Sequence, residues 1–304
     1  MKVIIDTDPG HDDAMALMLL LKSKQVDVVA VTTVAGNSTI ENTTRNAAYI
    51  LDLLDRNDIP LYSGAAKPLK RKLVQAVVHG ESGLDGIDIT TQTQLTNNAA
   101  KKIVDIVKRY PNQITLVTLG PLTNIAQAIM HDPETMKNVQ RIVIMGGAFE
   151  VPGNKNRVAE FNMFVDPEAA SVVLDLPVRK VFVPLDACNH IQLTLSDFEQ
   201  VKNRSLREAL LAMNRPYIEN LKQDMAAEGA LMYDVLAAYY VLDPEVCKTK
   251  AVNIELEITG EFTRGMTIID KRPVPDKKQP NAERVQYIPA EAFKSRFITT
   301  LNSE

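Results

Sequence analysis

The chain has 304 residues, of which 45% are apolar and 24% are charged, and its formal net charge is −4. This balance is typical of a soluble globular protein, and the excess of acid argues against a nucleic-acid partner, which would require a basic face. No apolar run reaches the roughly 18 residues of a membrane span, and the N-terminus lacks a signal-peptide layout. Two cysteines, Cys188 and Cys247, do not make a disulfide framework, so we expect a cytoplasmic setting. The sequence has no Cys/His cluster of the metal-binding type, so we expect any metal to be a hard cation bound through oxygen.

Strand-like and helix-like runs alternate along the first 190 residues. Strands are predicted at 3–5, 28–34, from 61, 114–119, 141–145 and 180–184, and helices at 14–21, 40–56, 97–110, 122–130 and 166–176. This repetition predicts an α/β fold with an open, mostly parallel, Rossmann-like sheet that has helices on both faces.

Beyond residue 190 the pattern becomes mainly helical. Helices are predicted near 196–225, 232–242 and 290–301, with short strands at about 252–258, 266–270 and 285–288. The polar stretch 271–283 contains three prolines and is predicted to be a surface loop. No linker rich in Gly, Ser or Pro divides the chain, so we expect a single domain over residues 1–304.

An acidic turn follows the first predicted strand. Asp6, Asp8, Asp12 and Asp13 fall within eight residues, between two apolar runs. Like charges this close take up protons unless a cation neutralises them. An EF-hand is excluded because the loop lacks the Glu and the Gly that such a loop requires. The simplest interpretation is a metal site of another kind.

Other polar groups follow the later predicted strands. They are Asn37, the segment 120–124, Gly146 with Gly147, the loop that carries Asn154, Glu160 and Asn162, and Asp186 with Asn189. In open parallel sheets, ligands bind beyond the carboxyl ends of the strands. Amides and carboxylates there suit a ligand rich in hydroxyls, and no Walker-type Gly-Lys-Ser is present to hold a phosphate.

The acidic turn, Asp6-Thr7-Asp8-Pro9-Gly10-His11-Asp12-Asp13-Ala14, resembles the opening signature of the nucleoside hydrolases, the inosine–uridine-preferring nucleoside N-ribohydrolases. Further matches to this family occur in the right order and cover nearly the whole chain. They are Asn37, 79–86, 120–126, 145–147, Asn154 with 160–162 and 166–170, and Asp234. The resemblance implies the nucleoside hydrolase fold.

The resemblance also implies a metal-dependent reaction. It assigns one Ca²⁺ ion to Asp8, Asp13, Asp234 and the backbone carbonyl of Leu119, with Asp6 as support from behind. Two ribose hydroxyls and a water would complete the roughly six to eight oxygens that calcium prefers. Asp8 would also be the general base for the attack of that water. The product of the reaction, which passes through an oxocarbenium-like state, would be ribose and a free purine or pyrimidine base.

The resemblance places the ribonucleoside substrate against a larger set of residues. The implied binding residues are Asp12, Asn37, Met145, Asn154, Glu160, Phe161 and Asn162. It further implies a role in purine and pyrimidine salvage and a homo-oligomer, either a tetramer or a dimer.

Tyr233 departs from part of the family, in which His often precedes the last metal-binding Asp. Tyrosine can donate a proton or stack on a base, but its reference pKa of about 10 makes it a weak acid. His79 is a second polar group for the leaving base, so we assign both residues to that step. The chain has no Trp, so the tryptophan-stacking arrangement of the purine-specific branch is absent. The base preference stays open.

Two alternative functions compete with nucleoside hydrolysis. One is a calcium-dependent protein that binds nucleosides or sugars without catalysis, and Tyr233 is its only support. The other is a phosphohydrolase of the haloacid dehalogenase kind, in which Asp6 would be the nucleophile and Asp8 the acid. That class usually continues with Gly-Thr, whereas this chain continues with Pro9 and Gly10.

Overall fold

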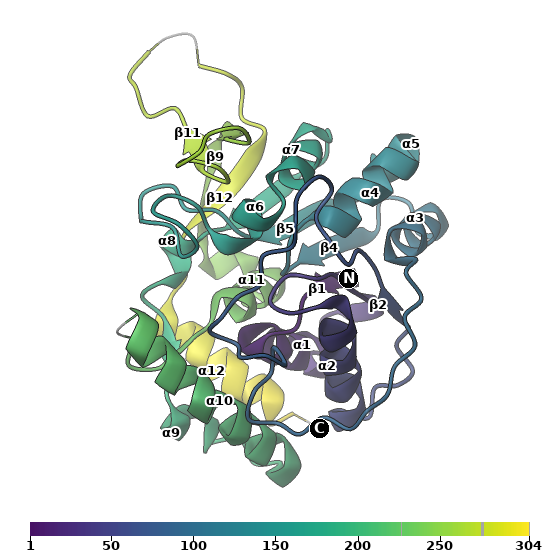
Figure 1. Ribbon diagram of the computed structural model, residues 1–304, viewed down its shortest axis with the longest axis vertical. Helices are drawn as coiled ribbons and strands as arrows, with labels where there is room; N and C mark the ends of the chain where they lie inside the picture. The colour runs from purple at the N-terminus through teal and green to yellow at the C-terminus, as the bar shows by residue number, and fades with distance from the viewer. Residues whose placement is uncertain (226, 275–276, 304) are drawn as a thin grey trace.

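The computed structural model describes residues 1–225, 227–274 and 277–303. Its centre is a twisted eight-stranded sheet (Figure 1). The strands run parallel except the last, which pairs antiparallel at one edge. Their order across the sheet is β3 (Leu61–Ser63), β2 (Asp27–Thr33), β1 (Lys2–Thr7), β4 (Ile114–Thr118), β5 (Arg141–Met145), β6 (Lys180–Val183), β12 (Ala282–Tyr287) and β9 (Lys248–Val252). The mostly parallel sheet predicted from the sequence is confirmed.

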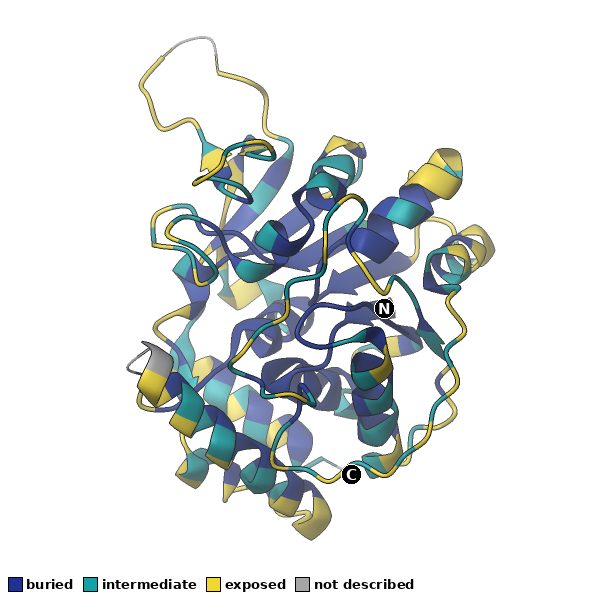
Figure 2. Cartoon of the chain, in the orientation of Figure 1, coloured by how far each residue is buried: buried dark blue, intermediate teal, exposed yellow. Residues whose placement is uncertain are grey.

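Helices cover both faces of this sheet (Figures 1 and 2). Successive strand residues point to opposite faces, so Val3 and Ile5 enter one hydrophobic core and Ile4 enters the other. The first core contains residues of α1 (His11–Lys22), α2 (Ile40–Leu53), α10 (Arg204–Met225), α11 (Tyr233–Leu242) and α12 (Ala290–Leu301). The second contains residues of α3 (Ala99–Arg109), α4 (Thr123–His131), α5 (Pro133–Met136) and α7 (Pro167–Asp175).

Helices α1 and α11 are the most deeply buried. Every residue of α11 is buried, as is every residue of α1 except Lys22, and the two helices pack against each other. Both are apolar around nearly their whole circumference beyond the first turn, which is typical of a helix enclosed by other elements. Their first turns carry the acids of the candidate site, which are therefore buried as well.

The C-terminal part differs from the prediction in two places. The helix predicted at 196–225 is two helices, α9 (Leu195–Phe198) and α10, because Asn203 accepts the N–H of Leu206 (3.0 Å) and starts a new helix there. The strand predicted at 252–258 lies in two sheets, since β9 ends at Val252 and β10 (Ile254–Leu256) pairs with β11 (Thr267–Ile269). The remaining elements are α6 (Phe161–Val165), α8 (Leu185–Cys188), the 3-10 helix η1 (Pro244–Val246), and the strand pair β7 (Gln192–Leu193) and β8 (Ala230–Leu231).

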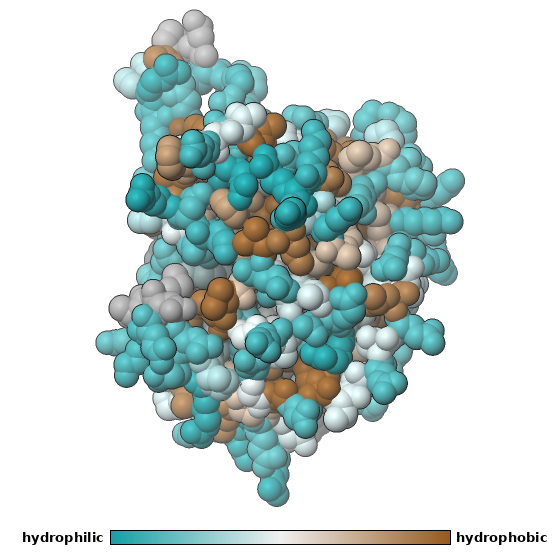
Figure 3. Space-filling view, viewed as in Figure 1, coloured by the Kyte–Doolittle hydropathy of each residue, from teal (hydrophilic) through white to brown (hydrophobic). Residues whose placement is uncertain are grey.

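The predicted loop 271–283 is exposed over 271–274 and 277–280, and β12 begins within it at Ala282. Residues 275–276 lie outside the described part. The surface seen in Figure 3 is mainly hydrophilic, with apolar side chains in small groups. Among the described residues, no helix has the length and apolar character that crossing a membrane requires.

Candidate active site

Asp13, in the first turn of α1, is the best-anchored acid of the turn after β1. Its carboxylate is fully buried and accepts four hydrogen bonds. The donors are the Thr7 hydroxyl (2.6 Å), the Asn37 amide (2.9 Å), and the backbone N–H groups of Gly10 (3.1 Å) and Asp8 (3.2 Å). The bond from Gly10 caps α1, whose N-terminus favours a negative charge. Asp13 therefore has a fixed orientation.

Asp8 packs between two loops that follow β2 and β4. Its Oδ2 accepts the backbone N–H of Asn37 (2.7 Å), while its Oδ1 is buried without a hydrogen-bond partner. A Cβ atom on Gly36 would lie 2.1 Å from Oδ2, and one on Gly120 would lie 2.3 Å from Oδ1. Burial first, and then the charge of Asp13, raises the pKa of Asp8 well above its usual range.

Asp12 and Asp234 bring together the first turns of α1 and α11. The backbone N–H of Asp234 donates to Asp12 Oδ2 (3.4 Å). With Asp13 they form a cluster in which one oxygen from each carboxylate lies within 4.8 Å of the others. Burial raises the pKa of Asp12 to about 7, and burial with the charge of Asp12 raises that of Asp234 well above its usual range. Asp234 Oδ1 is buried without a partner.

This arrangement fits a hard divalent cation. Among the described residues, three buried carboxylate oxygens, on Asp6, Asp8 and Asp234, have no hydrogen-bond donor, and the clustered acids raise the pKa of Asp8 and Asp234. A cation would offset both costs. The side-chain donors are all carboxylate oxygens, the ligand type of Ca²⁺ and Mg²⁺. Leu119, at the end of β4, lines the adjoining cavity, and its carbonyl accepts a bond from the Asn162 amide (2.6 Å).

Asp6 lies at the end of β1 and is fully buried. Its Oδ1 accepts hydrogen bonds from the Thr32 hydroxyl (2.5 Å) and the Asn124 amide (2.7 Å). Burial raises its pKa to about 7 in spite of these two donors. Because Asn124 also donates to the Thr33 carbonyl (2.9 Å), Asp6 is tied to β2 and α4.

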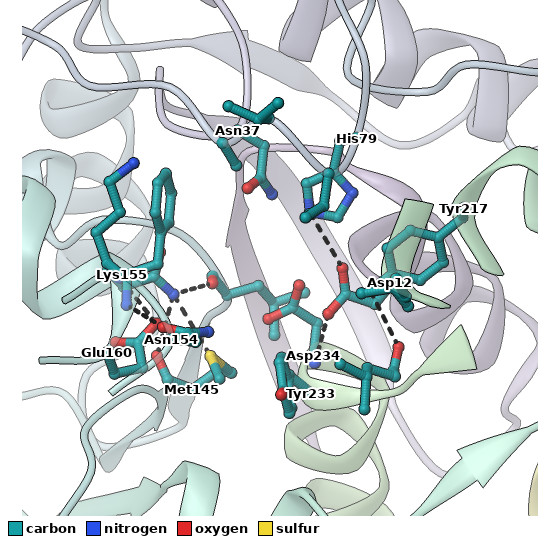
Figure 4. Close-up of a pocket in the computed structure, with 18 residues that line it drawn as sticks. Asp12, Asn37, His79, Met145, Asn154, Lys155, Glu160, Tyr217, Tyr233 and Asp234 are labelled. Carbon is teal, nitrogen blue, oxygen red and sulfur yellow. Dashed lines mark hydrogen bonds and ion pairs between the residues drawn. The ribbon is translucent and has the colours of Figure 1, made fainter. Parts of the chain in front are cut away.

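A cavity of about 280 Å³ opens beside the acids. Figure 4 shows Asn154, Lys155 and Glu160 on one side of it and His79 and Tyr217 on the other, with acids between them. The first wall is mainly polar, with the ring of Phe161 beside Lys155, and the second is aromatic. The lining residues are Asp12, Asn37, 76–79, Leu119, Met145, Asn154, Lys155, 160–162, Tyr217, Leu221, Leu231, Tyr233 and Asp234.

The polar wall is built by the start of α6. Glu160 caps this helix, and its carboxylate accepts the N–H groups of Asn162 (2.8 Å), Met163 (3.1 Å) and Gly147 (3.2 Å). Burial nevertheless raises the pKa of Glu160 to about 7. Asn154 is fixed beside the helix because its Oδ1 accepts the N–H of Phe161 (2.8 Å).

His79 is held on the aromatic wall in one tautomer. Its Nδ1 accepts the backbone N–H of His11 (3.2 Å), so the proton of the neutral ring is on Nε2, which lies 3.9 Å from Asp12 Oδ1. Burial lowers the pKa of His79 well below its usual range, which favours this neutral form. The ring stacks on Tyr217 with centroids 5.3 Å apart. His79 therefore offers the cavity a hydrogen-bond donor.

Tyr233 begins α11 and is 8% exposed. Its hydroxyl donates a hydrogen bond to Asn189 Oδ1 (3.0 Å). Burial raises the pKa of Tyr233 well above its usual range, which keeps the phenol protonated. The assignment of Tyr233 to the leaving-group step stays a prediction.

Comparison with known proteins gives one consistent result. The family model of the inosine–uridine-preferring nucleoside hydrolases matches residues 3–295. The chain belongs to this family. A pyrimidine-specific ribonucleoside hydrolase of Shigella boydii is 38% identical over 288 residues, which cover 92% of this chain and 91% of the relative. These matches identify the chain as a hydrolase of N-glycosidic bonds in ribonucleosides and decide against the phosphohydrolase.

Solved nucleoside hydrolases share the fold over the whole chain. A plant nucleoside hydrolase, PpNRh1, superposes with a TM-score of 0.91 at 30% identity and covers 100% of this chain and 99% of its own. A purine-preferring ribonucleoside hydrolase from Gardnerella vaginalis also gives 0.91, at 28% identity, and covers 99% of this chain and 98% of its own. The predicted nucleoside hydrolase fold is confirmed.

Most residues predicted for the nucleoside hydrolase site line the cavity. Asp6, Asp8 and Asp13 do not, although Asp8 and Asp13 each accept a hydrogen bond from Asn37, which does. The cluster of three carboxylates contains Asp12, Asp13 and Asp234, whereas the predicted metal ligand Asp8 is not part of it. One oxygen of Asp8, Oδ2, accepts the N–H of Asn37.

Sequence reasoning missed several residues of the nucleoside hydrolase cavity, above all Tyr217, Lys155 and the segment 76–78. Tyr217 and Leu221 lie one helical turn apart on α10, a spacing that signals a common face but not what that face contacts. Asn189 had been noted after β6 without a role, and its contact with Tyr233 was not predictable from spacing.

Proposed function

We propose that this chain hydrolyses ribonucleosides with a bound Ca²⁺ ion, so that a nucleoside and water give ribose and a free base. The observation that carries the proposal is the cavity, in which buried acids separate a polar wall from an aromatic one. The acids suit a cation and the hydroxyls of a sugar, the polar wall suits further hydroxyls, and the aromatic wall suits a planar base.

Asp8, Asp13, Asp234 and the carbonyl of Leu119 would hold the ion, and Asp6 would support them from behind. A bound cation of this kind makes water more acidic and offsets the charge of the acids. The all-oxygen donor set supports calcium over a transition metal.

Asp8 takes the proton of the attacking water. Its Oδ1 has no hydrogen-bond partner, so it is available to accept that proton. The glycosidic carbon becomes positively charged as the bond to the base breaks, and the surrounding carboxylates stabilise that charge because they are already in place.

Polar side chains fix the ribose so that its glycosidic carbon faces the water. A site built to bind hydroxyls rejects analogues that lack them. The residues proposed for this role are Asp12, Asn37, Asn154, Glu160 and Asn162, with Met145 and Phe161 shaping the cavity. On the other wall, the Nε2–H of His79 donates to the departing base.

We infer a cytoplasmic enzyme of nucleoside salvage that folds as one domain and assembles as a dimer or tetramer. The family match over residues 3–295 supports the single domain, and two unpaired cysteines support a reducing compartment. Size-exclusion chromatography with light scattering tests the assembly.

A substrate panel tests the reaction. Reducing sugar released from inosine, uridine, cytidine and adenosine is measured with a chelator and after calcium is restored. We expect ribose from at least one nucleoside, loss of activity with the chelator, and recovery with Ca²⁺. No ribose from any substrate would refute hydrolysis, and activity that survives complete chelation would refute the metal.

A further inference from the structure

The contact between Tyr233 and Asn189 joins the cavity to a residue outside it. Tyr233 lines the cavity, and its hydroxyl lies 3.0 Å from Asn189 Oδ1. Asn189 follows α8 beyond the carboxyl end of β6, and it is exposed to solvent. The predicted motifs give Asn189 no role, and the proposed reaction does not use it.

The direction of this hydrogen bond decides what Tyr233 presents to a substrate. A phenol has one proton, and the carbonyl oxygen of an amide can only accept. With that proton directed to Asn189, the phenol oxygen has only lone pairs left for the cavity. His79 presents the opposite group, because the N–H of His11 fixes its proton on Nε2. A base between α11 and the segment 76–79 thus meets one acceptor and one donor.

We infer that Asn189 is a positioning residue that holds Tyr233 as a hydrogen-bond acceptor, and that Tyr233 thereby selects ribonucleosides whose base has an N–H or amino group facing α11. This inference rests on the proposed function and narrows its substrates. A base without such a group leaves the lone pairs of the buried phenol oxygen without a donor, and buried polar groups that lack a partner discriminate strongly between close analogues.

Nucleosides that lack the donor provide the test. Inosine and adenosine are compared with the riboside of unsubstituted purine, and uridine and cytidine with the riboside of pyrimidin-2-one. The measured quantity is the ratio of kcat/KM within each pair. The Tyr233→Phe variant removes the acceptor and keeps the ring. We expect its ratios to fall roughly 3- to 10-fold from the wild-type ratios, and intrinsic differences between leaving groups cancel in that comparison. Unchanged ratios would overturn the inference.

Two variants of Asn189 test the positioning role. Asn189→Asp keeps an acceptor for the phenol proton, so it should preserve the wild-type ratios. Asn189→Leu removes that acceptor and should lower the ratios toward those of Tyr233→Phe. The positioning role would be overturned if Asn189→Leu kept the wild-type ratios. It would also be overturned if Asn189→Asp preferred bases that lack the donor. Asn57→Leu, a substitution at an exposed asparagine that contacts Asp52, is the matched control and should change nothing.

The outcomes separate this inference from the proposed function. A wild-type protein that releases ribose from no nucleoside refutes the function itself. A wild-type protein that is active, with variants that leave every ratio unchanged, refutes only the roles of Tyr233 and Asn189. The calcium-induced rise in melting temperature is measured for each variant, and an unchanged rise shows that the neighbouring Asp234 is intact.

Discussion

At the scale of single residues, the strongest support for a bound cation comes from Asp8 and Asp234. Each has a buried carboxylate oxygen without a hydrogen-bond partner. Asparagine has the same shape as aspartate but no charge, so Asp8→Asn and Asp234→Asn should each abolish the calcium-induced rise in melting temperature. Each should lower kcat at least about 100-fold, the usual cost of losing a preorganised charge at a reacting centre. Thermal unfolding with and without Ca²⁺, together with ribose release, checks both effects.

The same variants should not unfold the protein. Without calcium, removing one of several repelling buried acids relieves repulsion, so the melting temperature should stay level or rise. Asp58→Asn is the control because Asp58 is exposed and pairs with Arg56 away from the cavity. An Asn variant that keeps the full response to calcium would remove that residue from the metal site.

The stacking of the His79 ring and the hydrogen bond from its N–H group can be tested separately. His79→Phe keeps a ring that stacks on Tyr217 but loses the Nε2 donor and also the Nδ1 acceptor for the His11 N–H, so kcat should fall roughly 100- to 1,000-fold while KM changes little. Steady-state kinetics on the best nucleoside of the panel give both constants. The exposed His131→Phe should behave as wild type. If KM rose by that factor while kcat stayed at the wild-type value, His79 would be assigned to substrate binding alone.

The local sequence predicts that some of these residues belong to the site, but it does not predict the contacts of others. Asp6, Asp8, Asp12 and Asp13 could be assigned to a site because they fall in one turn between a strand and a helix. The partner of Tyr233 could not, since Asn189 lies 44 positions earlier and meets it only after α8 and α11 pack. The hydrogen bond on which the inferred role of Tyr233 rests is a property of that packing.

At the scale of elements, the loops after β2 and β4 form a cradle that only glycine fits. Gly36→Ala and Gly120→Ala would each place a methyl group within 2.3 Å of an Asp8 oxygen, so Asp8 must move. We expect calcium affinity to fall roughly 10- to 100-fold, as when support around a metal ligand is lost. Isothermal titration with Ca²⁺ measures the change. Gly260→Ala, which crowds Thr263 in another loop, is the control and should leave calcium affinity unchanged. A loss of affinity in this variant as well would show that the effect does not depend on contact with Asp8.

The elements themselves were predictable where apolar runs are long and regular. The parallel strands and α1, α4, α7, α11 and α12 follow from such runs, because both faces of the sheet are buried. The break between α9 and α10 was not, since it depends on the cap at Asn203 in a sequence that otherwise reads as continuous helix. The split between β9 and β10 depends on which sheet each strand joins, and local pattern does not contain that information.

At the scale of the whole molecule, the acids lie where burial is greatest. Helices α1 and α11 are enclosed by the fold, and their first turns bring Asp12, Asp13 and Asp234 into the interior. Buried like charges destabilise a fold unless they are protonated or neutralised by a cation. The stability of the whole chain should therefore depend on both pH and calcium.

The calcium-free protein should lose stability as the pH rises from about 4 to about 7. The folded state raises the pKa of Asp6, Asp12 and Glu160 to about 7, from unperturbed values of 3.8, 3.8 and 4.5. Between those limits these three acids hold protons in the folded chain that they lose in the unfolded chain, so the stabilisation they give at low pH is lost as the pH rises. The buried rings of His11 and His79, whose pKa is lowered by burial, offset part of this loss. Each pKa unit corresponds to about 1.4 kcal/mol, so the melting temperature should fall by several degrees.

Calcium should reverse this trend because it favours the charged carboxylates around it. The rise in melting temperature on adding Ca²⁺ should be small at about pH 4.5, where the acids are protonated and bind the ion poorly, and large at about pH 7.5. Scanning calorimetry at both pH values, with chelator or with excess calcium, measures all four states. A calcium-free protein that becomes more stable across this range, or a calcium response that is equal at both ends, would show that the buried acids do not control the stability of the fold.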